Sequence, residues 1–476
     1  MDKKYKILIP LMIAGAMNTV DTSAMNVTMP TFAEYFNLPL QTVSWISSTY
    51  LLVLAGLLLT SGRIGDIYGF VKPFKAGVFI TTLGTTLCSL APSFAFLLVA
   101  RVIQASGVSL LMSTIPALIT TSFPPEERGK AMGFYIISVS IGLLTGPSLG
   151  GLILSKFSWR FIFLVNVPLG ITAFITSNWL TSKQTEKTSN SFDYAGTFLT
   201  LTFLISLLYY LNQGSNIGWL SKTGLALIIT SIVSLVTFIY VEKRNSEPML
   251  DLRLFSNKIF VSGLLSTFLY FASQMVMVFL APVLLNAANY SSKVTGFTVI
   301  AFPVSMLIFA SVGGHLSDRI NPDIVSTIGA AIAGLSIFLI GTLPPLSFSN
   351  VDLIWRMFIF GIGGGLFETS VSVTLLSSAP EHMRGVASGI WAMVKNMGMV
   401  FGVTISSTLS SLRSEYHRQS LISAVNELID IATIQGVKDV HMLAFVLITL
   451  CALLSLLRIK ASSEKKTFSI EKSGTR

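Results

Sequence analysis

The chain has 476 residues, of which 52% are hydrophobic and only 11% are charged, and its mean hydropathy is +0.73. Soluble proteins carry about 25% charged residues, so this composition excludes a soluble globular fold, a disordered chain and a small disulfide-stapled domain. The net charge of +10 could indicate nucleic-acid binding only if the basic residues clustered on one face.

Fourteen mainly apolar runs follow one another along the chain. A membrane-spanning helix needs about 20 such residues. The first run exceeds the ~7–15 apolar residues of a cleavable signal peptide, and we interpret it as a retained span. Strands are not predicted, because the runs are apolar on every face. The predicted spans are 7–27, 43–61, 74–90, 94–122, 131–154, 161–180, 194–211, 223–241, 260–285, 295–312, 324–343, 353–376, 386–409 and 442–457.

The basic residues orient these spans. With the N-terminus inside, 22 of the 32 Lys and Arg residues fall on the inner face, 7 on the outer face and 3 within spans. Cytoplasmic loops of membrane proteins carry excess Lys and Arg. The pattern therefore predicts a multi-pass protein with both termini in the cytoplasm, and it gives nucleic-acid binding no support.

An internal repeat divides the chain. The segment that begins at Gly62 recurs 252 residues later at Gly314, and Arg128 with Gly129 recurs 256 residues later as Arg384 with Gly385. Each pair follows predicted helices that are eight apart, so two extra helices lie between two six-helix halves. Paired halves are typical of secondary transporters. We expect an N-terminal half at 1–182, two inserted helices with cytoplasmic linkers at 183–258, a C-terminal half at 259–460 and a disordered cytoplasmic tail at 461–476.

Two motifs lie near the start of the chain. In the first span, Asp21 is followed by Thr22, Asn26, Val27 and Pro30. The loop after the second span holds a glycine-rich motif with two charges. Its residues are Gly62, Arg63, Asp66 and Gly69, and the repeat places Asp318 and Arg319 after the tenth span.

The fifth span carries a run of small residues: Gly142, Gly146, Pro147, Gly150 and Gly151. In order and spacing, this run and the two earlier motifs resemble those of the major facilitator superfamily, in particular its fourteen-helix drug:proton antiporter branch. The resemblance covers nearly the whole chain. It implies an all-α polytopic membrane protein with the major facilitator fold.

The resemblance also implies a function: proton-driven efflux of amphipathic drugs or toxic organic compounds by alternating access. The protein would work as a monomer embedded in the lipid of the bacterial cytoplasmic membrane. It would bind protons and small molecules and would need no cofactor and no metal. An exporter of a single endogenous metabolite or of one antibiotic class remains an alternative, as does a channel or membrane receptor. An enzyme is not expected, because the four histidines show no metal-ligand spacing. The absence of a phosphate-binding loop argues against direct ATP drive.

The few charges inside spans are the candidates for proton coupling. Asp21 lies roughly 21 Å along its helix, where a charge costs about 2.5–3.5 kcal/mol and usually faces a cavity or a partner. Glu368 lies deep in the twelfth span and could take the proton, bind a cationic substrate, or pair structurally with Lys395. By the resemblance, Arg101 assists proton transfer; otherwise it is a hydrogen-bonded strut.

The remaining candidates concern gating and the substrate cavity. Asp66 and Asp318 could each accept hydrogen bonds from a nearby helix N-terminus and latch the halves, or could simply be solvated in a loop. The glycines of the fifth span would seal the path against proton leak, or merely permit close packing. A largely apolar cavity needs a few polar anchors. The cavity candidates are Asn26, Gln274, Met275 and Lys395. The segment 412–438 is expected to be an outer loop containing an amphipathic helix or hairpin.

Overall fold

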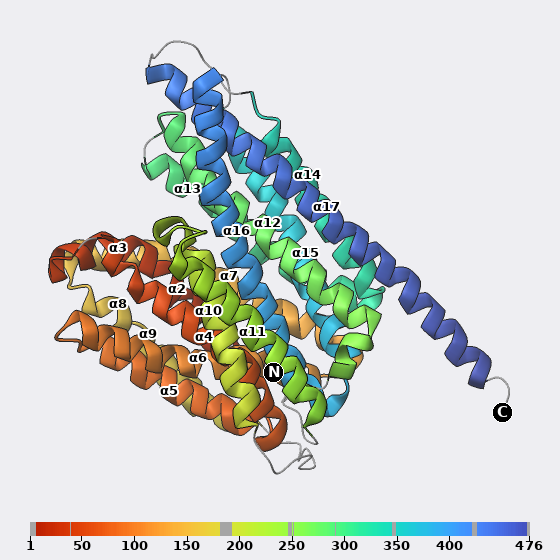
Figure 1. Ribbon diagram of the computed structural model, residues 1–476. Coiled ribbons are helices and arrows are strands. Elements are labelled where there is room, and N and C mark those ends of the chain that lie inside the picture. Colours follow the sequence, from red (N-terminus) through yellow and green to blue (C-terminus); the bar gives the residue numbers. More distant parts are fainter. Residues whose placement is uncertain are drawn as a thin grey trace. The chain divides into compact units, whose positions relative to one another are not determined.

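The structure is a computed structural model that describes residues 6–38, 40–180, 193–245, 250, 252–290, 292–344, 349–420 and 426–473. Every regular element in this part of the chain is a helix (Figure 1). The α-helices are α2 (Leu8–Phe36), α3 (Leu40–Val43), α4 (Trp45–Tyr68), α5 (Val71–Ser89), α6 (Phe94–Ser122), α7 (Arg128–Lys156), α8 (Arg160–Leu164), α9 (Asn166–Thr176), α10 (Tyr194–Ile217), α11 (Lys222–Arg244), α12 (Lys258–Ala287), α13 (Ser292–Arg319), α14 (Pro322–Gly341), α15 (Asn350–Ser378), α16 (Arg384–Ser420) and α17 (Asn426–Ser473). Four short 3₁₀ helices complete them: η1 (Pro125–Glu127), η2 (Ser177–Trp179), η3 (Leu252–Ser256) and η4 (Glu381–Met383).

Twelve helical stretches within the described residues are long and apolar enough to cross a membrane. They coincide with twelve of the predicted spans, which are thereby confirmed as helices. The remaining two predicted positions are occupied by α2, with 29 residues, and α5, with 19 residues. Helix is the expected outcome, because a backbone in lipid must satisfy its own hydrogen bonds.

The structure differs from the sequence prediction at the ends of the last two long helices. Within the expected outer loop 412–438, α16 continues to Ser420 and α17 begins at Asn426. At the other end, α17 stays helical to Ser473, across most of the segment predicted to be a disordered tail (Figure 1). Hydropathy shows where a helix leaves the apolar region, but the helix itself ends at breakers such as Gly and Pro. Neither residue occurs in 403–420 or 437–473, so both helices continue beyond their apolar segments.

The helices form two units. Unit 1 comprises Met1–Leu252 together with Ala379–Met393, and unit 2 comprises Arg253–Ser378 together with Val394–Arg476. In unit 1, α2 packs on α7 and α9, α6 packs on α4 and α5, and α10 packs on both α4 and α11. In unit 2, α15 packs on α13 and α14, and α17 packs on α12 and α14.

The two units repeat one crossing in detail. The hydroxyls of Ser61 on α4 and Ser109 on α6 are 2.8 Å apart in unit 1, and those of Ser317 on α13 and Ser370 on α15 are 2.7 Å apart in unit 2. Ser317 follows Ser61 by 256 residues, the same offset that relates Arg384 to Arg128. A hydrogen bond between neighbouring helices is a common stabilising contact within membranes.

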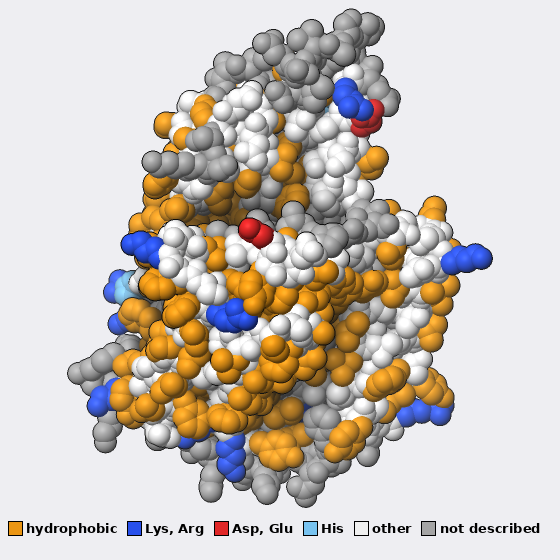
Figure 2. All heavy atoms as spheres, turned by 90° about the vertical axis from the view of Figure 1, so that its left-hand side faces the viewer, with side chains coloured by type: hydrophobic (Ala, Val, Ile, Leu, Met, Phe, Trp, Pro, Cys, Tyr) orange, Lys and Arg blue, Asp and Glu red, His pale blue; other side chains and the backbone are white. Residues whose placement is uncertain are grey.

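Hydrophobic side chains face outward in both units. They cover much of the surface shown in Figure 2, where Lys and Arg are few and scattered. On α11, for example, Ile229, Ile232, Val233, Val236 and Tyr240 are all exposed. An apolar exterior of this extent suits a lipid environment.

Candidate functional site

Asp21 and Arg101 form a buried ion pair in unit 1. The Arg101 Nη1 atom lies 2.7 Å from Asp21 Oδ2, and the side chains of Arg101 and Asp21 are 1% and 3% exposed. Gln104 supports both partners, because its Oε1 accepts from Arg101 at 2.6 Å and its Nε2 donates to Asp21 at 3.2 Å. The same Nε2 donates to the Thr85 hydroxyl at 3.2 Å. The pair is thus held by α2, α5 and α6 together.

Aromatic rings and a second amide extend this pair. The guanidinium carbon of Arg101 lies 4.6 Å from the centre of the Tyr50 ring and 5.6 Å from that of Phe163. The Tyr50 hydroxyl lies 2.5 Å from Asn18 Oδ1. Sequence reasoning missed both Asn18 and Tyr50, because a lone amide and a lone ring in apolar helices give no signal until their partners are known.

Glu368 and Lys395 form a largely buried ion pair in unit 2. Lys395 on α16 donates to Glu368 Oε1 on α15, and the side chains are 16% and 4% exposed. The Lys395 ammonium also lies 4.5 Å from the centre of the Phe271 ring on α12, a cation–π contact. The pairing that the sequence left as one of three alternatives is therefore present.

Tyr270 lies on α12 beside this pair. Its ring stacks on Phe367 at 4.3 Å and on Phe360 at 5.8 Å. Its hydroxyl fits against Gly364, where an added Cβ would come within 2.6 Å of the oxygen. In the described part of the chain this buried hydroxyl has no hydrogen-bond partner.

The cavity candidates lie in different places. Gln274 is buried on α12, one turn after Tyr270, and Met275 is half-buried against Gly402 of α16. Lys395 belongs to the ion pair just described. Asn26 lies on α2, but its side chain is outside the described residues.

Asp66 binds the N-terminus of α16. Its two carboxylate oxygens accept from the backbone N–H groups of Gly385, at 2.7 Å, and Val386, at 2.8 Å. The helices touch closely here, because a Cβ added at Gly62 would come within 2.3 Å of the Gly385 carbonyl oxygen. All of these residues belong to unit 1. A carboxylate at a helix N-terminus is stabilised by the free N–H groups and by the helix dipole.

The other residues of the two loop motifs occupy the ends of α4 and α13. Arg63 is half-buried on α4, and Gly69 ends that helix with φ +76°, a conformation that favours glycine. At the end of α13, Asp318 is half-buried and Arg319 is exposed.

The glycines of the fifth span pack α7 against α2. A Cβ added at Gly142 would lie 2.0 Å from the Thr19 hydroxyl, and one at Gly146 would lie 1.8 Å from the Ser23 hydroxyl. Further along α7 the contact opens: Gly150 would be 3.5 Å from Ala24, Gly151 would meet nothing within 4 Å, and Pro147 is exposed. Only the first half of the motif forms a tight interface.

Unit 2 repeats this packing. A Cβ added at Gly398 on α16 would lie 2.6 Å from the Phe268 carbonyl oxygen, and one at Gly402 would lie 2.3 Å from that of Ala272, both on α12. Gly398 and Gly402 follow Gly142 and Gly146 by 256 residues. The two units therefore share a glycine-mediated contact between their first and fifth helices.

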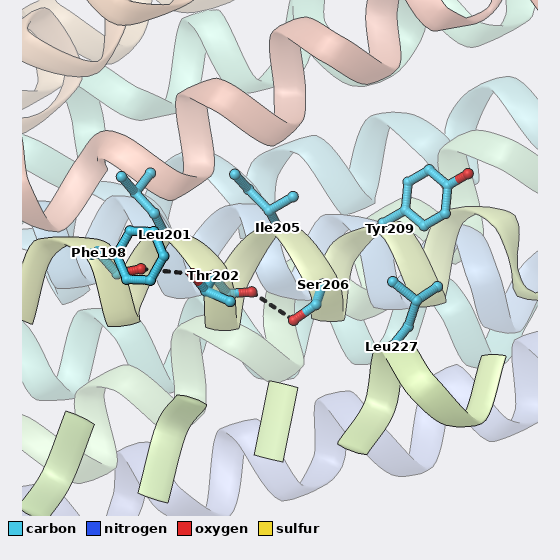
Figure 3. Close-up of a pocket in the computed structure, with 7 residues that line it drawn as sticks. All are labelled: Phe198, Leu201, Thr202, Ile205, Ser206, Tyr209 and Leu227. Carbon is cyan, nitrogen blue, oxygen red and sulfur yellow. Dashed lines mark hydrogen bonds between the residues drawn. The ribbon is translucent and has the colours of Figure 1, made fainter. Parts of the chain in front are cut away.

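An apolar groove of about 440 Å³ lies along α10 and α11 in unit 1. Its residues are Phe198, Leu201, Thr202, Ile205, Ser206, Tyr209 and Leu227 (Figure 3). Its two aliphatic hydroxyls are bonded to their own helix, Thr202 to the Phe198 carbonyl at 2.8 Å and Ser206 to the Thr202 carbonyl at 2.6 Å. The groove therefore offers a ligand apolar contact and little hydrogen bonding.

Residues 11–403 match the model of the Major Facilitator Superfamily. The chain belongs to this family. It is therefore a multi-pass membrane transporter that binds small molecules, and it is not an enzyme. Among the described residues, no group of three His, Cys, Asp or Glu side chains could hold a metal ion.

The curated relatives of this family member include several named transporters. It is 30% identical to the riboflavin transporter RibZ of Clostridioides difficile, over 88% of this chain and 91% of the relative. It is 29% identical to the multidrug resistance protein Stp of Mycobacterium tuberculosis, over 81% and 72%. It is 24% identical to the multidrug export protein EmrB of Haemophilus influenzae, over 88% and 83%.

Solved structures show the same fold. The human organic anion transporter MFSD10 matches with a TM-score of 0.65 at 13% identity, covering 94% of this chain and all of that one. The proton:xylose symporter XylE matches with a TM-score of 0.63 at 15% identity, covering 93% and 94%. At these identities the likeness establishes the major facilitator fold alone.

Chemically, each unit contains a largely buried acid–base pair, Asp21–Arg101 in unit 1 and Glu368–Lys395 in unit 2, and unit 2 contains a further one between Asp323 and Arg458. Two of the three predicted proton-coupling residues, Asp21 and Arg101, contact each other, and the third, Glu368, contacts Lys395. Each pair can exist as two charges or, once the carboxylate takes a proton, as one cation. A transporter can use such a change of charge to favour one conformation over another.

Proposed function

We propose that this transporter exports amphipathic drugs or toxic organic compounds in exchange for protons, by alternating access in the bacterial cytoplasmic membrane. Its likeness to the multidrug proteins Stp and EmrB supports the substrate class. The proposed topology has fourteen spans with both termini in the cytoplasm. It comprises halves at 1–182 and 259–460, an inserted pair of helices at 183–258 and a tail at 461–476.

The observation that carries proton coupling is the Glu368–Lys395 pair. Glu368 is 4% exposed within a candidate span, and it is paired with a lysine on a flexible stem that is itself 16% exposed. A proton on Glu368 cancels the attraction between the two charges, and the Lys395 ammonium can then move toward water because lysine is a mobile point charge. Deprotonation restores the pair. Each proton that crosses 100 mV supplies about 2.3 kcal/mol to drive this cycle.

We assign a supporting part to Asp21 and Arg101. The Arg101 guanidinium contacts the Asp21 carboxylate, the Gln104 amide and the face of the Tyr50 ring, so the side chain cannot move away without breaking several contacts. The proposed role of this pair is to hold the proton pathway of unit 1 in one geometry and to stabilise Asp21 as a carboxylate while substrate is bound.

The proposed gate uses Asp66 and the α7 glycines. Two hydrogen bonds from the N-terminus of α16 to Asp66 would latch α4, and would break when α4 moves. The equivalent latch at the end of α13 would use Asp318. Close packing of Gly142 and Gly146 on α2 leaves little space for water, which would limit proton leak along that interface.

Proteoliposomes loaded with a pH-sensitive dye test the coupling. In the wild type, adding an exported probe such as ethidium should move protons, whereas in Glu368→Gln the probe-driven proton flux should disappear with expression unchanged. Asp352→Asn is the matched control, because this carboxylate lies on the same helix but is 39% exposed beside Arg356. Undiminished flux in Glu368→Gln would overturn the assignment, and an ion current without any probe would favour a channel.

A second candidate function is transport of one metabolite. It is favoured by the 30% identity to the riboflavin transporter RibZ. The two candidates differ in breadth: a multidrug exporter should protect cells against several unrelated cationic and neutral compounds, whereas a metabolite transporter should move a flavin-like compound and confer no such protection. A drug-susceptibility panel, run beside riboflavin flux in the same cells, separates them.

A further inference from the structure

The amide of Asn18 is bonded to a poor acceptor. Its Nδ2 atom donates to the Met112 sulfur at 3.8 Å, and in the described part of the chain no other acceptor is bonded to it. A thioether accepts only weakly, while an amide nitrogen carries two N–H donors. The nitrogen is the end that faces Met112, because the thioether can accept but cannot donate.

The other end of the same amide is tightly held. Asn18 Oδ1 lies 2.5 Å from the Tyr50 hydroxyl, which donates to it. The orientation of the amide is thereby fixed, and its donors point toward Met112. A strong donor aimed at a weak acceptor in apolar surroundings favours any ligand oxygen that reaches it.

The surroundings of Asn18 suit a ligand. Asn18 is half-buried, and Thr22, one turn later on the same face of α2, is exposed. The side chains of Leu51, Val53 and Met112 are half-buried and pack against the hydrophobic cluster that contains Tyr50. A polar stripe on a membrane helix normally faces a cavity rather than lipid, and methionine adapts to ligands of different shape.

Tyr50 connects Asn18 to the ion pair of unit 1. The Tyr50 ring lies 4.6 Å from the Arg101 guanidinium, and Arg101 lies 2.7 Å from Asp21. Asn18, Tyr50, Arg101 and Asp21 therefore form one continuous series of contacts from a half-buried amide to a buried carboxylate.

We propose that Asn18 is a substrate-binding residue whose side-chain amide donates to a carbonyl or ether oxygen of the transported compound. Tyr50 is the positioning residue that orients Asn18 and links its occupancy to the Arg101–Asp21 pair. This inference rests on the proposed export of small amphipathic compounds. It adds to that proposal a chemical preference, for substrates that carry a hydrogen-bond acceptor oxygen.

The test compares two probes on the full-length protein in detergent by equilibrium dialysis. Riboflavin carries ring carbonyls, whereas tetraphenylphosphonium has no hydrogen-bond acceptor. Asn18→Ala should weaken riboflavin binding roughly three- to tenfold, the value of one hydrogen bond, and leave tetraphenylphosphonium within about twofold. Thr172→Val is the matched control, because that exposed hydroxyl is bonded to the Pro168 carbonyl of its own helix, α9, away from every site described above. It should change neither affinity.

Tyr50→Phe separates positioning from packing. The variant keeps the ring under Arg101 and removes only the hydroxyl, so thermal stability should hardly change. In proteoliposomes its maximal rate should fall more than its apparent affinity for the carbonyl probe, whereas Asn18→Ala should raise KM and spare the maximal rate.

Equal loss for both probes in Asn18→Ala, no loss for either, or a wild type that binds no carbonyl-bearing probe would each overturn the inference. Failure of the proposed function looks different: the wild type would bind riboflavin through Asn18 but would move no protons when the probe is transported.

Discussion

The Asp21–Arg101 pair of unit 1 and the Glu368–Lys395 pair of unit 2 differ in how their cation is held. In unit 1, Arg101 contacts a carboxylate, an amide and two aromatic faces, and its side chain is 1% exposed. In unit 2, Lys395 is bonded to Glu368 and contacts one aromatic face, and its side chain is 16% exposed. A planar guanidinium suits a fixed, multiply bonded pair, whereas an ammonium on four methylenes can be released. The difference suggests that one pair maintains structure and the other changes during transport.

The largest expected effect follows from breaking the fixed pair. Arg101→Leu leaves Asp21 buried without its cation and should lower the free energy of unfolding by about 3–5 kcal/mol. Chemical denaturation in detergent micelles measures this change. The double variant Asp21→Leu/Arg101→Leu should recover most of the stability but no transport. A stable single variant would contradict the view that this pair maintains the structure.

The next largest effect concerns the releasable pair. Lys395→Leu leaves Glu368 unpaired, but the lysine side chain is 16% exposed, so water reaches its position and can compensate, and the loss should be about 1.5–3 kcal/mol. The same denaturation measurement compares it directly with Arg101→Leu. Lys395→Arg should restore stability yet slow proton-driven export, because an arginine that binds Glu368 in two places is harder to release. If both lysine variants destabilise as much as Arg101→Leu, the distinction between the pairs is wrong.

The helices of both units were predictable from sequence for a simple reason. A long apolar segment in lipid must form its backbone hydrogen bonds within itself, and a helix does this, so α6, α12 and the other long helices follow from hydropathy. The glycine contacts of α7 also follow from spacing. The extensions of α16 to Ser420 and α17 to Ser473 do not, because hydropathy locates the lipid and carries no information about where a helix ends.

The candidate site was only partly predictable. A charged residue inside a membrane span is rare because it costs free energy to bury, so Asp21, Arg101 and Glu368 could be selected from the sequence. Their partners could not be predicted in the same way. Asp21 and Arg101 are 80 residues apart in sequence, and several different pairings would compensate the buried charges equally well. Tyr50 and Asn18 were missed because neither is unusual in an apolar helix. Only the contacts of Asn18 on α2 with Tyr50 on α4 and Met112 on α6 reveal them.

A smaller effect should come from the glycine contact that the units share. Gly146→Ala forces a methyl group within 1.8 Å of the Ser23 hydroxyl and should cost about 1–3 kcal/mol. Gly151→Ala is the matched control on the same helix, because an added methyl there meets nothing within 4 Å. Passive proton flux into proteoliposomes without substrate should rise only in Gly146→Ala. An equal rise in both variants would mean that close packing does not limit leak.

The smallest effect should come from a third ion pair, between α16 and α17 in unit 2. Arg413 Nε lies 2.8 Å from Asp439 Oδ2, as close as the buried pairs, but the side chains are 47% and 34% exposed. Exposed pairs contribute about 0.2–1 kcal/mol, and His417 also contacts the same carboxylate oxygen at 2.8 Å. Arg413→Gln should therefore change the free energy of unfolding by less than about 1 kcal/mol and leave export intact. A loss as large as that of Arg101→Leu would show that pairing matters here more than burial, and would remove the basis for ranking the three pairs by exposure.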